Sequence, residues 1–278
     1  MTQTMTPPRW SLDDLVAEPI QDNIDAALAA LETDVAAFEN RRERLREDME
    51  AAELLTLLRQ YEAIMHRGHL LGAYAYLRFS ENTQDQTSLS IRDRLDQALT
   101  AFENRVLFFT LWLKAIPEEA AARLMPDDPD LRHFITSLRK FQPHTLTEPE
   151  ERVINLKDTN GIDAMTNLYD MIVSAFSFRL EVDGKTKTLT RDELTAYFRH
   201  PSADIRAAAY QELYRVYAEN SAVLAQIYSH RVRDWYAEGI GLRHFPTPMS
   251  VRNLQNDIPD QVVEALLEAS RRNSGLFQ

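Results

Sequence analysis

The stretch Glu53-Leu-Leu-Thr-Leu-Leu-Arg-Gln-Tyr-Glu-Ala-Ile-Met65 decides the fold class. Its apolar residues recur at intervals of three and four, the spacing that places side chains on one face of an α-helix. The pattern predicts a helix over residues 53–76 and indicates that helices dominate the chain. The residues expected to face the core are Leu54, Leu57, Leu58, Tyr61, Ile64 and Met65.

The same spacing recurs on both sides of this stretch. Upstream, Ile24 to Phe38 predict a helix over residues 20–45, and downstream Ile91 to Phe109 predict one over residues 88–114. Thr147 with Glu150 has the form of a capping box, which starts a helix. The other helices are expected over residues 117–123, 131–141, 147–160, 164–174, 202–220 and 221–240, with turns or loops at 80–85, 125–130 and 245–248 and a last helix from near Pro259.

Only one segment has the pattern of β-strands. Phe176, Phe178, Leu180 and Val182 alternate with other residues, and Asp183-Gly184 predicts a type I′ turn before a returning strand over residues 185–189. Thr190 and Glu193 form a second capping box that restarts a helix. The expected fold class is therefore mainly α, a multi-helix lobe with one small β-hairpin near 176–189.

We also expect apolar residues on one face of each later helix to be buried. On residues 164–174 these are Met165, Leu168, Ile172 and Val173. The corresponding positions on the two following helices are Ile205, Ala209, Leu213, Val216 and Tyr217, and then Leu224, Ile227, Tyr228 and Val232. Gly239 and Gly241 are expected to stop the second of these helices.

Composition excludes several kinds of partner and chemistry. The 278 residues are 44% apolar and 27% charged, with a net charge of −12. An acidic surface repels nucleic acids and anionic membranes, so neither is expected as a partner. The chain contains no cysteine, which excludes disulfides and thiol catalysis.

The chain also lacks the usual targeting patterns. Residues 1–10 contain no apolar core of the kind a secretory signal requires. The longest apolar run, Val106 to Leu113, is much shorter than the roughly 20 residues of a membrane-spanning helix. We therefore expect a cytoplasmic protein.

Histidines offer no convincing metal site. His66 and His69 lie three residues apart on a predicted helix, but zinc helices place His at i and i+4 with Glu between them. No third ligand is evident, so a structural role for this pair is the favoured interpretation. The remaining histidines lie near predicted helix ends, where a structural role is again expected: they are His133, His144, His200, His230 and His244.

The carboxylates are explained by helix capping. Acidic groups cluster at turns or helix starts, where the helix dipole favours negative charge. They are Asp13-Asp14, Asp127-Asp128-Asp130 and Glu148-Glu150-Glu151. No nucleophile elbow, phosphate-binding loop or dinucleotide fingerprint occurs.

Aromatic residues are dense between 210 and 236. Core packing is the first interpretation, and tyrosine hydroxyls that line a substrate cleft are the alternative. The residues are Tyr210, Tyr214, Tyr217, Tyr228, Trp235 and Tyr236. Taken from its residues alone, the chain is an acidic, mainly helical scaffold without a self-contained active site.

An ordered set of segments resembles the oligoendopeptidase F branch of the thimet-oligopeptidase-like zinc metallopeptidases. The stretch from Arg252 to Val263 is the most specific, and it follows the stretch from Arg199 to Tyr210. The other matching segments are Trp10-Ser-Leu12, Tyr74-Ala-Tyr76 with Ser80, His144-Thr-Leu146 with Glu150-Glu151, Leu189 to Leu194, Asp234-Trp235, Leu242-Arg243 and Pro246 to Ser250.

The resemblance implies a zinc endopeptidase that acts on short oligopeptides. In that family a His-Glu-x-x-His helix and a later Glu hold the zinc, and the metal activates water. This sequence contains no His-Glu-x-x-His. We therefore assign no catalytic, cofactor-binding or metal residue to this chain, and expect the zinc ligands of the parent protein to lie outside it.

The resemblance also implies a division of labour along the chain. Residues 1–200 would form a helical N-terminal lobe that walls the substrate channel, and residues 201–278 would begin the catalytic domain. The apolar pattern Val262, Val263, Leu266, Leu267 still runs near Gln278, so a truncated peptidase, inactive alone, is expected. The alternative is a complete, non-catalytic helical module that binds peptides or proteins.

Overall fold

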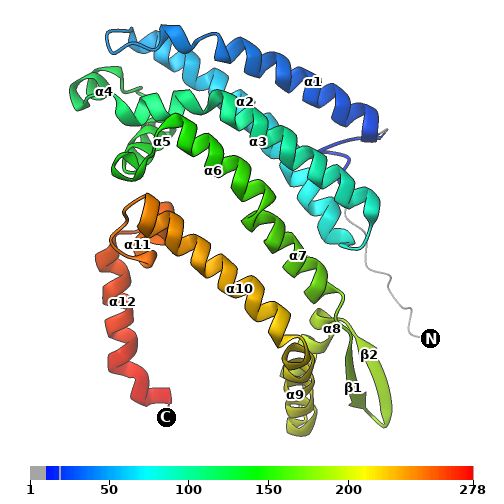
Figure 1. The fold of residues 1–278 in the computed structure, drawn as a ribbon. Helices are drawn as coiled ribbons and strands as arrows, with labels where there is room; N and C mark the ends of the chain where they lie inside the picture. Colours follow the sequence, from blue (N-terminus) through cyan, green and yellow to red (C-terminus); the bar gives the residue numbers. More distant parts are fainter. Residues whose placement is uncertain (1–10, 19, 278) are drawn as a thin grey trace. The chain divides into compact units, whose positions relative to one another are not determined.

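The computed structural model describes residues 11–18 and 20–277, and it is mainly helical with one antiparallel hairpin (Figure 1). The helices and strands are α1 Ile20–Glu39, α2 Ala51–Glu81, α3 Gln86–Ala115, α4 Glu118–Leu124, α5 Pro129–Arg139, α6 Glu148–Asn160, α7 Ile162–Ser174, β1 Phe178–Val182, β2 Lys185–Leu189, α8 Arg191–Ala196, α9 Ala203–Glu219, α10 Ser221–Tyr236, α11 Pro248–Gln255 and α12 Asp260–Asn273. The mainly α fold class is thus confirmed. Trp10 and Gln278, which the sequence interpretation used, lie outside the described residues.

The chain divides into two compact units. Unit 1 comprises Met1–Leu156 and Gly239–Gln278, and unit 2 comprises Lys157–Glu238. These units reflect compactness, whereas the boundary that we expect between residues 200 and 201 separates a lobe from a catalytic domain. That boundary stays a prediction. Each unit is described by itself below.

Unit 1 is built on α1, α2 and α3, which pack on one another along their lengths (Figure 1). Val35, Leu95 and Phe109 are fully buried between them. The rings of Phe38 and Phe109 meet edge to face at 5.3 Å between centroids, an arrangement that aromatic rings prefer. The predicted inward residues of the second helix are buried or half-buried, because the three-and-four spacing places them on this interface.

Unit 2 is built around the hairpin. Phe178, Leu180 and Val182 of β1 are buried against α8 and α9, and the intervening residues are exposed. Asp183 and Gly184 have φ of 53° and 71°, which confirms the type I′ turn. The Thr190–Glu193 capping box is also present, with both of its reciprocal hydrogen bonds. Local turn and cap chemistry therefore determines where this segment reverses.

Several predicted helix ends are wrong. α1 ends at Glu39 rather than residue 45, and a short 3₁₀ turn follows at Arg42–Arg44. Residues 41–44 carry four charged side chains and none that could pack on a core, so little favours continuing the helix. α2 instead continues to Glu81, because Phe79 is buried in the last turn.

The segment after α10 differs most from expectation. Gly239 and Gly241 do not stop the helix but lie within π-helical turns at Ala237–Leu242. The loop predicted over residues 245–248 instead leads directly into α11, whose first residue is Pro248. Thr247 caps this helix by accepting a hydrogen bond from the Ser250 N–H at 3.0 Å. The sequence signal for this helix is a proline directly after a threonine cap.

Three residues predicted to face a core are exposed instead. The exposed fractions are 48% for Leu168, 71% for Tyr228 and 47% for Val232. Ile227 next to Tyr228 is buried, so the inward face of α10 is narrower than its apolar pattern.

None of the described helices is both long and apolar enough to cross a bilayer.

Candidate functional site

The structure does not bring the predicted histidine pair to a site. His66 and His69 are both exposed on α2. Among the residues that the structure describes, neither belongs to a group of three possible metal ligands.

Two other histidines have structural roles at helix boundaries. The Nδ1–H of His144 donates to the backbone oxygen of Arg243 at 2.8 Å, and its ring stacks on Phe245 at 3.6 Å. His200 Nδ1 accepts a hydrogen bond from the Ser202 N–H at 3.1 Å. Both contacts use histidine as a hydrogen-bonding group near a helix end, as the sequence suggested.

Two of the predicted caps are confirmed. Asp128 accepts hydrogen bonds from the N–H groups of Asp130 and Leu131 at the start of α5. Glu150 accepts the Thr147 N–H at 2.9 Å. These contacts hold the pKa of both carboxyls below their usual range, since each accepts hydrogen bonds in its charged form. Glu151 is different, because it does not cap a helix.

Glu151 forms a buried ion pair with Arg243 in unit 1. Glu151 is 7% exposed, and its two oxygens accept from Nη1 and Nη2 of Arg243 at 2.7 and 2.8 Å. Oε1 also accepts the Leu146 N–H at 2.9 Å. Burial opposes ionisation of Glu151, but these donors prevail and hold its pKa below the usual range. No sequence spacing signals this pair, because the partners lie far apart in the chain.

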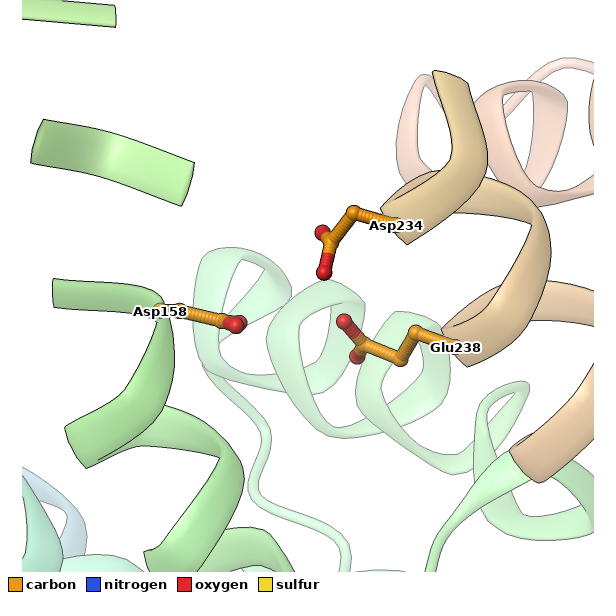
Figure 2. A group of neighbouring side chains, drawn as sticks. All are labelled: Asp158, Asp234 and Glu238. Atoms are coloured by element: carbon orange, nitrogen blue, oxygen red, sulfur yellow. The ribbon is translucent and has the colours of Figure 1, made fainter. Parts of the chain in front are cut away.

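An acidic cluster in unit 2 is the one group of three possible metal ligands within the described part of the chain. Asp158 comes from the end of α6, Asp234 from α10, and Glu238 from the π-helical turn that follows (Figure 2). One carboxylate oxygen from each residue lies within 4.8 Å of the other two. Asp234 and Glu238 are one helical turn apart, but nothing in the sequence indicates that Asp158 joins them.

The chemistry of this cluster suits a proton or a hard cation. Burial raises the pKa of Asp234, and the charge of Glu238 raises it further, while Arg231 acts against both. Oxygen-only ligands favour magnesium or calcium, whereas protein zinc sites rely on His or Cys. The cluster therefore does not resemble the zinc site that the family resemblance implies.

The aromatic residues of unit 2 divide between core and surface. Tyr217 packs edge to face on Phe176, with 5.3 Å between ring centroids. Tyr210 stacks on Phe198 at 3.9 Å and lines a cleft of about 480 Å³ with Arg199. Tyr214, Tyr228 and Tyr236 are more than half exposed. Core packing therefore holds for Tyr217, and the interpretation of the other tyrosines as lining a substrate cleft stays a prediction.

A sequence comparison identifies part of the chain. Residues 112–178, from the end of α3 into β1, match the family model described as Oligopeptidase F. The matched residues are therefore similar to a part of oligopeptidase F. No curated protein matches the chain in sequence.

Structural comparison extends the likeness over most of the fold. Oligoendopeptidase-F from Enterococcus faecium matches with a TM-score of 0.77 and 17% identity, over 91% of this chain and 50% of that one. A putative peptidase from Chlamydophila abortus matches with a TM-score of 0.59 and 16% identity, over 96% of this chain and 45% of that one. At these identities the likeness shows the fold alone, and this chain spans about half the length of each structure.

Proposed function

We propose that this chain is the N-terminal part of a zinc metalloendopeptidase that hydrolyses short oligopeptides. One observation carries the proposal: 91% of the chain follows the fold of half of an oligoendopeptidase-F, and the oligopeptidase F match falls inside that span. The parent protein would bind flexible peptides, with zinc polarising the scissile carbonyl and activating water.

The proposed role of this chain is to form a wall of the substrate channel, and catalysis belongs to the rest of the parent protein. The sequence has no His-Glu-x-x-His, and the acidic cluster offers only oxygen ligands. Long packed helices such as α2 and α3 suit a rigid wall that folded proteins cannot pass. Residues 1–200 would form this lobe, and residues 201–278 would lead into the catalytic domain. We also propose a cytoplasmic location. The cytoplasm is reducing, and a chain without cysteine needs no disulfides there.

The exposed tyrosines of unit 2 support contact with peptides. Tyr228, Val232 and Tyr236 lie four residues apart and share one exposed face of α10. Tyrosine combines an apolar ring with a hydroxyl that can bond a peptide backbone. We assign this face to substrate contact within the proposed channel.

Two measurements test the proposal. The first is hydrolysis of a quenched fluorescent octapeptide by this chain, with added zinc and then with a chelator. The second is the gene sequence that adjoins codon 278. We expect no hydrolysis by this chain and an adjoining His-Glu-x-x-His segment. Chelator-sensitive hydrolysis by the chain alone would overturn the inactive assignment. A gene without that motif would overturn the peptidase and favour the non-catalytic binding module.

A further inference from the structure

A cleft in unit 1 combines an apolar wall with a lysine that has no role in the proposed function. It has a volume of about 540 Å³ and lies between the end of α3 and the segment from Gln142 to Glu148. Phe108, Leu111, Trp112 and Ala115 line one side. Because these positions are spaced by three and four, they form a continuous apolar face on α3.

Lys114 is the charged group that this cleft leaves without a partner. Its side chain is half-buried, and no hydrogen bond or ion pair joins its ammonium to a described residue. Burial lowers its pKa; the charge of Glu151 raises it, and that of Arg243 lowers it further. The chain thus keeps a partly desolvated cation here without a direct counter-ion, which is costly.

The carboxylates near Lys114 are already occupied. Glu151 holds both arms of the Arg243 guanidinium and the Leu146 N–H. Glu148 accepts from Arg42 Nη1 at 2.9 Å and lies 3.1 Å from Arg152 Nη2. Counting Lys114, these residues comprise four cations and two carboxylates, an excess of positive charge in a chain whose net charge is −12.

We propose that this cleft binds the carboxylate of a small ligand with an apolar body, anchored by Lys114. The carboxylate would lie against the ammonium, and the apolar body would lie against Phe108 and Trp112. A charge-assisted hydrogen bond to a partly buried ammonium is stronger than a neutral one. Two sources supply this chemistry, the C-terminal residue of a peptide and a free N-acyl amino acid. The inference stands apart from the proposed peptidase role, since it requires neither zinc nor hydrolysis.

The test is a fluorescence titration of the intact chain with N-acetyl-L-leucine. Trp112 lines the cleft and is one of three tryptophans, so a Trp112→Phe variant identifies the part of the signal that it supplies. We expect a saturable change with the acid and none with N-acetyl-L-leucinamide. Lys114→Gln should weaken binding at least about tenfold, equivalent to about 1.4 kcal/mol. Lys114→Arg, which keeps the charge, should retain most of it.

Lys185→Gln is the matched control, because Lys185 is an exposed lysine on β2 and its loss changes the net charge equally. It should bind as the unsubstituted chain does. Circular dichroism melts show whether each variant is folded. An equal response to the acid and the amide, or undiminished binding by folded Lys114→Gln, would overturn the proposal. Leucine-terminated tripeptides, free and amidated, separate the sources: tighter binding of the free tripeptide supports a peptide terminus, and tighter binding of N-acetyl-L-leucine supports a free acid.

Discussion

At the scale of single residues, Glu151 and Arg243 form a buried ion pair in unit 1. Removing one partner of a buried ion pair leaves the other charge without compensation, which typically costs about 3 to 5 kcal/mol. We therefore predict that Glu151→Gln lowers the free energy of unfolding by about 3 kcal/mol, measured by urea denaturation. Glu118→Gln is the control, because Glu118 bonds Arg139 at the surface and is 87% exposed. Its loss should change stability by less than about 1 kcal/mol, and equal effects would contradict this account.

The same pair sets a pH dependence. The pKa of Glu151 is lowered from 4.5 in the folded chain, so the unfolded chain binds the proton more readily. The stabilisation is therefore complete above pH 4.5 and is lost as pH falls through the folded-state pKa. Melting at a series of pH values should show the advantage of the unsubstituted chain over Glu151→Gln shrinking below pH 4.5. A constant difference down to strongly acid pH would show that the pair does not contribute through its charge.

Lys114 is predicted to reduce stability. Its pKa is lowered from 10.5, so the folded chain binds the proton less readily than the unfolded chain. The penalty is complete at pH values below the folded-state pKa and disappears as pH rises towards 10.5. Lys114→Met should therefore raise the free energy of unfolding at pH 7 by less than about 1 kcal/mol after solvent screening, and with it the melting temperature. The gain should shrink at alkaline pH. A melting temperature lowered by this substitution at pH 7 would contradict the desolvation argument.

At the scale of elements, the π-helical turn after α10 depends on one glycine. A Cβ on Gly239 would lie 2.9 Å from Cγ2 of Val251, a β-branched side chain with little freedom to move. Gly239→Ala should therefore cost about 1 to 3 kcal/mol, as overpacking does. Gly241 has open space at the same point, so Gly241→Ala should be neutral or slightly stabilising. Thermal melts compare the two variants, and equal destabilisation would refute the steric explanation.

The elements also show how far the sequence alone reaches. The hairpin and its type I′ turn were predictable because Asp183-Gly184 and the alternating strand act locally. The π-helical turn and the exposure of Tyr228 were not, because they depend on what packs against each segment. The candidate sites follow the same rule: the Asp128 cap is local, whereas Asp158 meets Asp234 only after folding.

At the scale of the whole molecule, the sequence pattern and the fold indicate the same family resemblance. The ordered segments of the sequence indicated oligoendopeptidase F, and the resemblance is confirmed by the match over residues 112–178 and by the fold. The sequence contains no His-Glu-x-x-His. The described residues also include exposed aromatic and apolar side chains on α10 and α12.

Of the helices that the structure describes, α12 (Asp260–Asn273) has an apolar face that is largely exposed to solvent. None of its residues is buried, and Val262, Leu266 and Leu267 are 57%, 66% and 46% exposed. Its first residue, Asp260, is held by Ser250 and Asn253 at 2.9 and 2.8 Å. A 14-residue helix without packing is marginal in water. We therefore predict that amides of Leu266 to Asn273 exchange with deuterium within seconds, while those at the centre of α3 stay protected for at least a thousandfold longer, about 4 kcal/mol. Mass spectrometry of pepsin fragments measures both in one sample. Protection of α12 that equals that of α3 would show that its apolar face is already covered, by self-association or otherwise, and a dilution series would then separate those two cases.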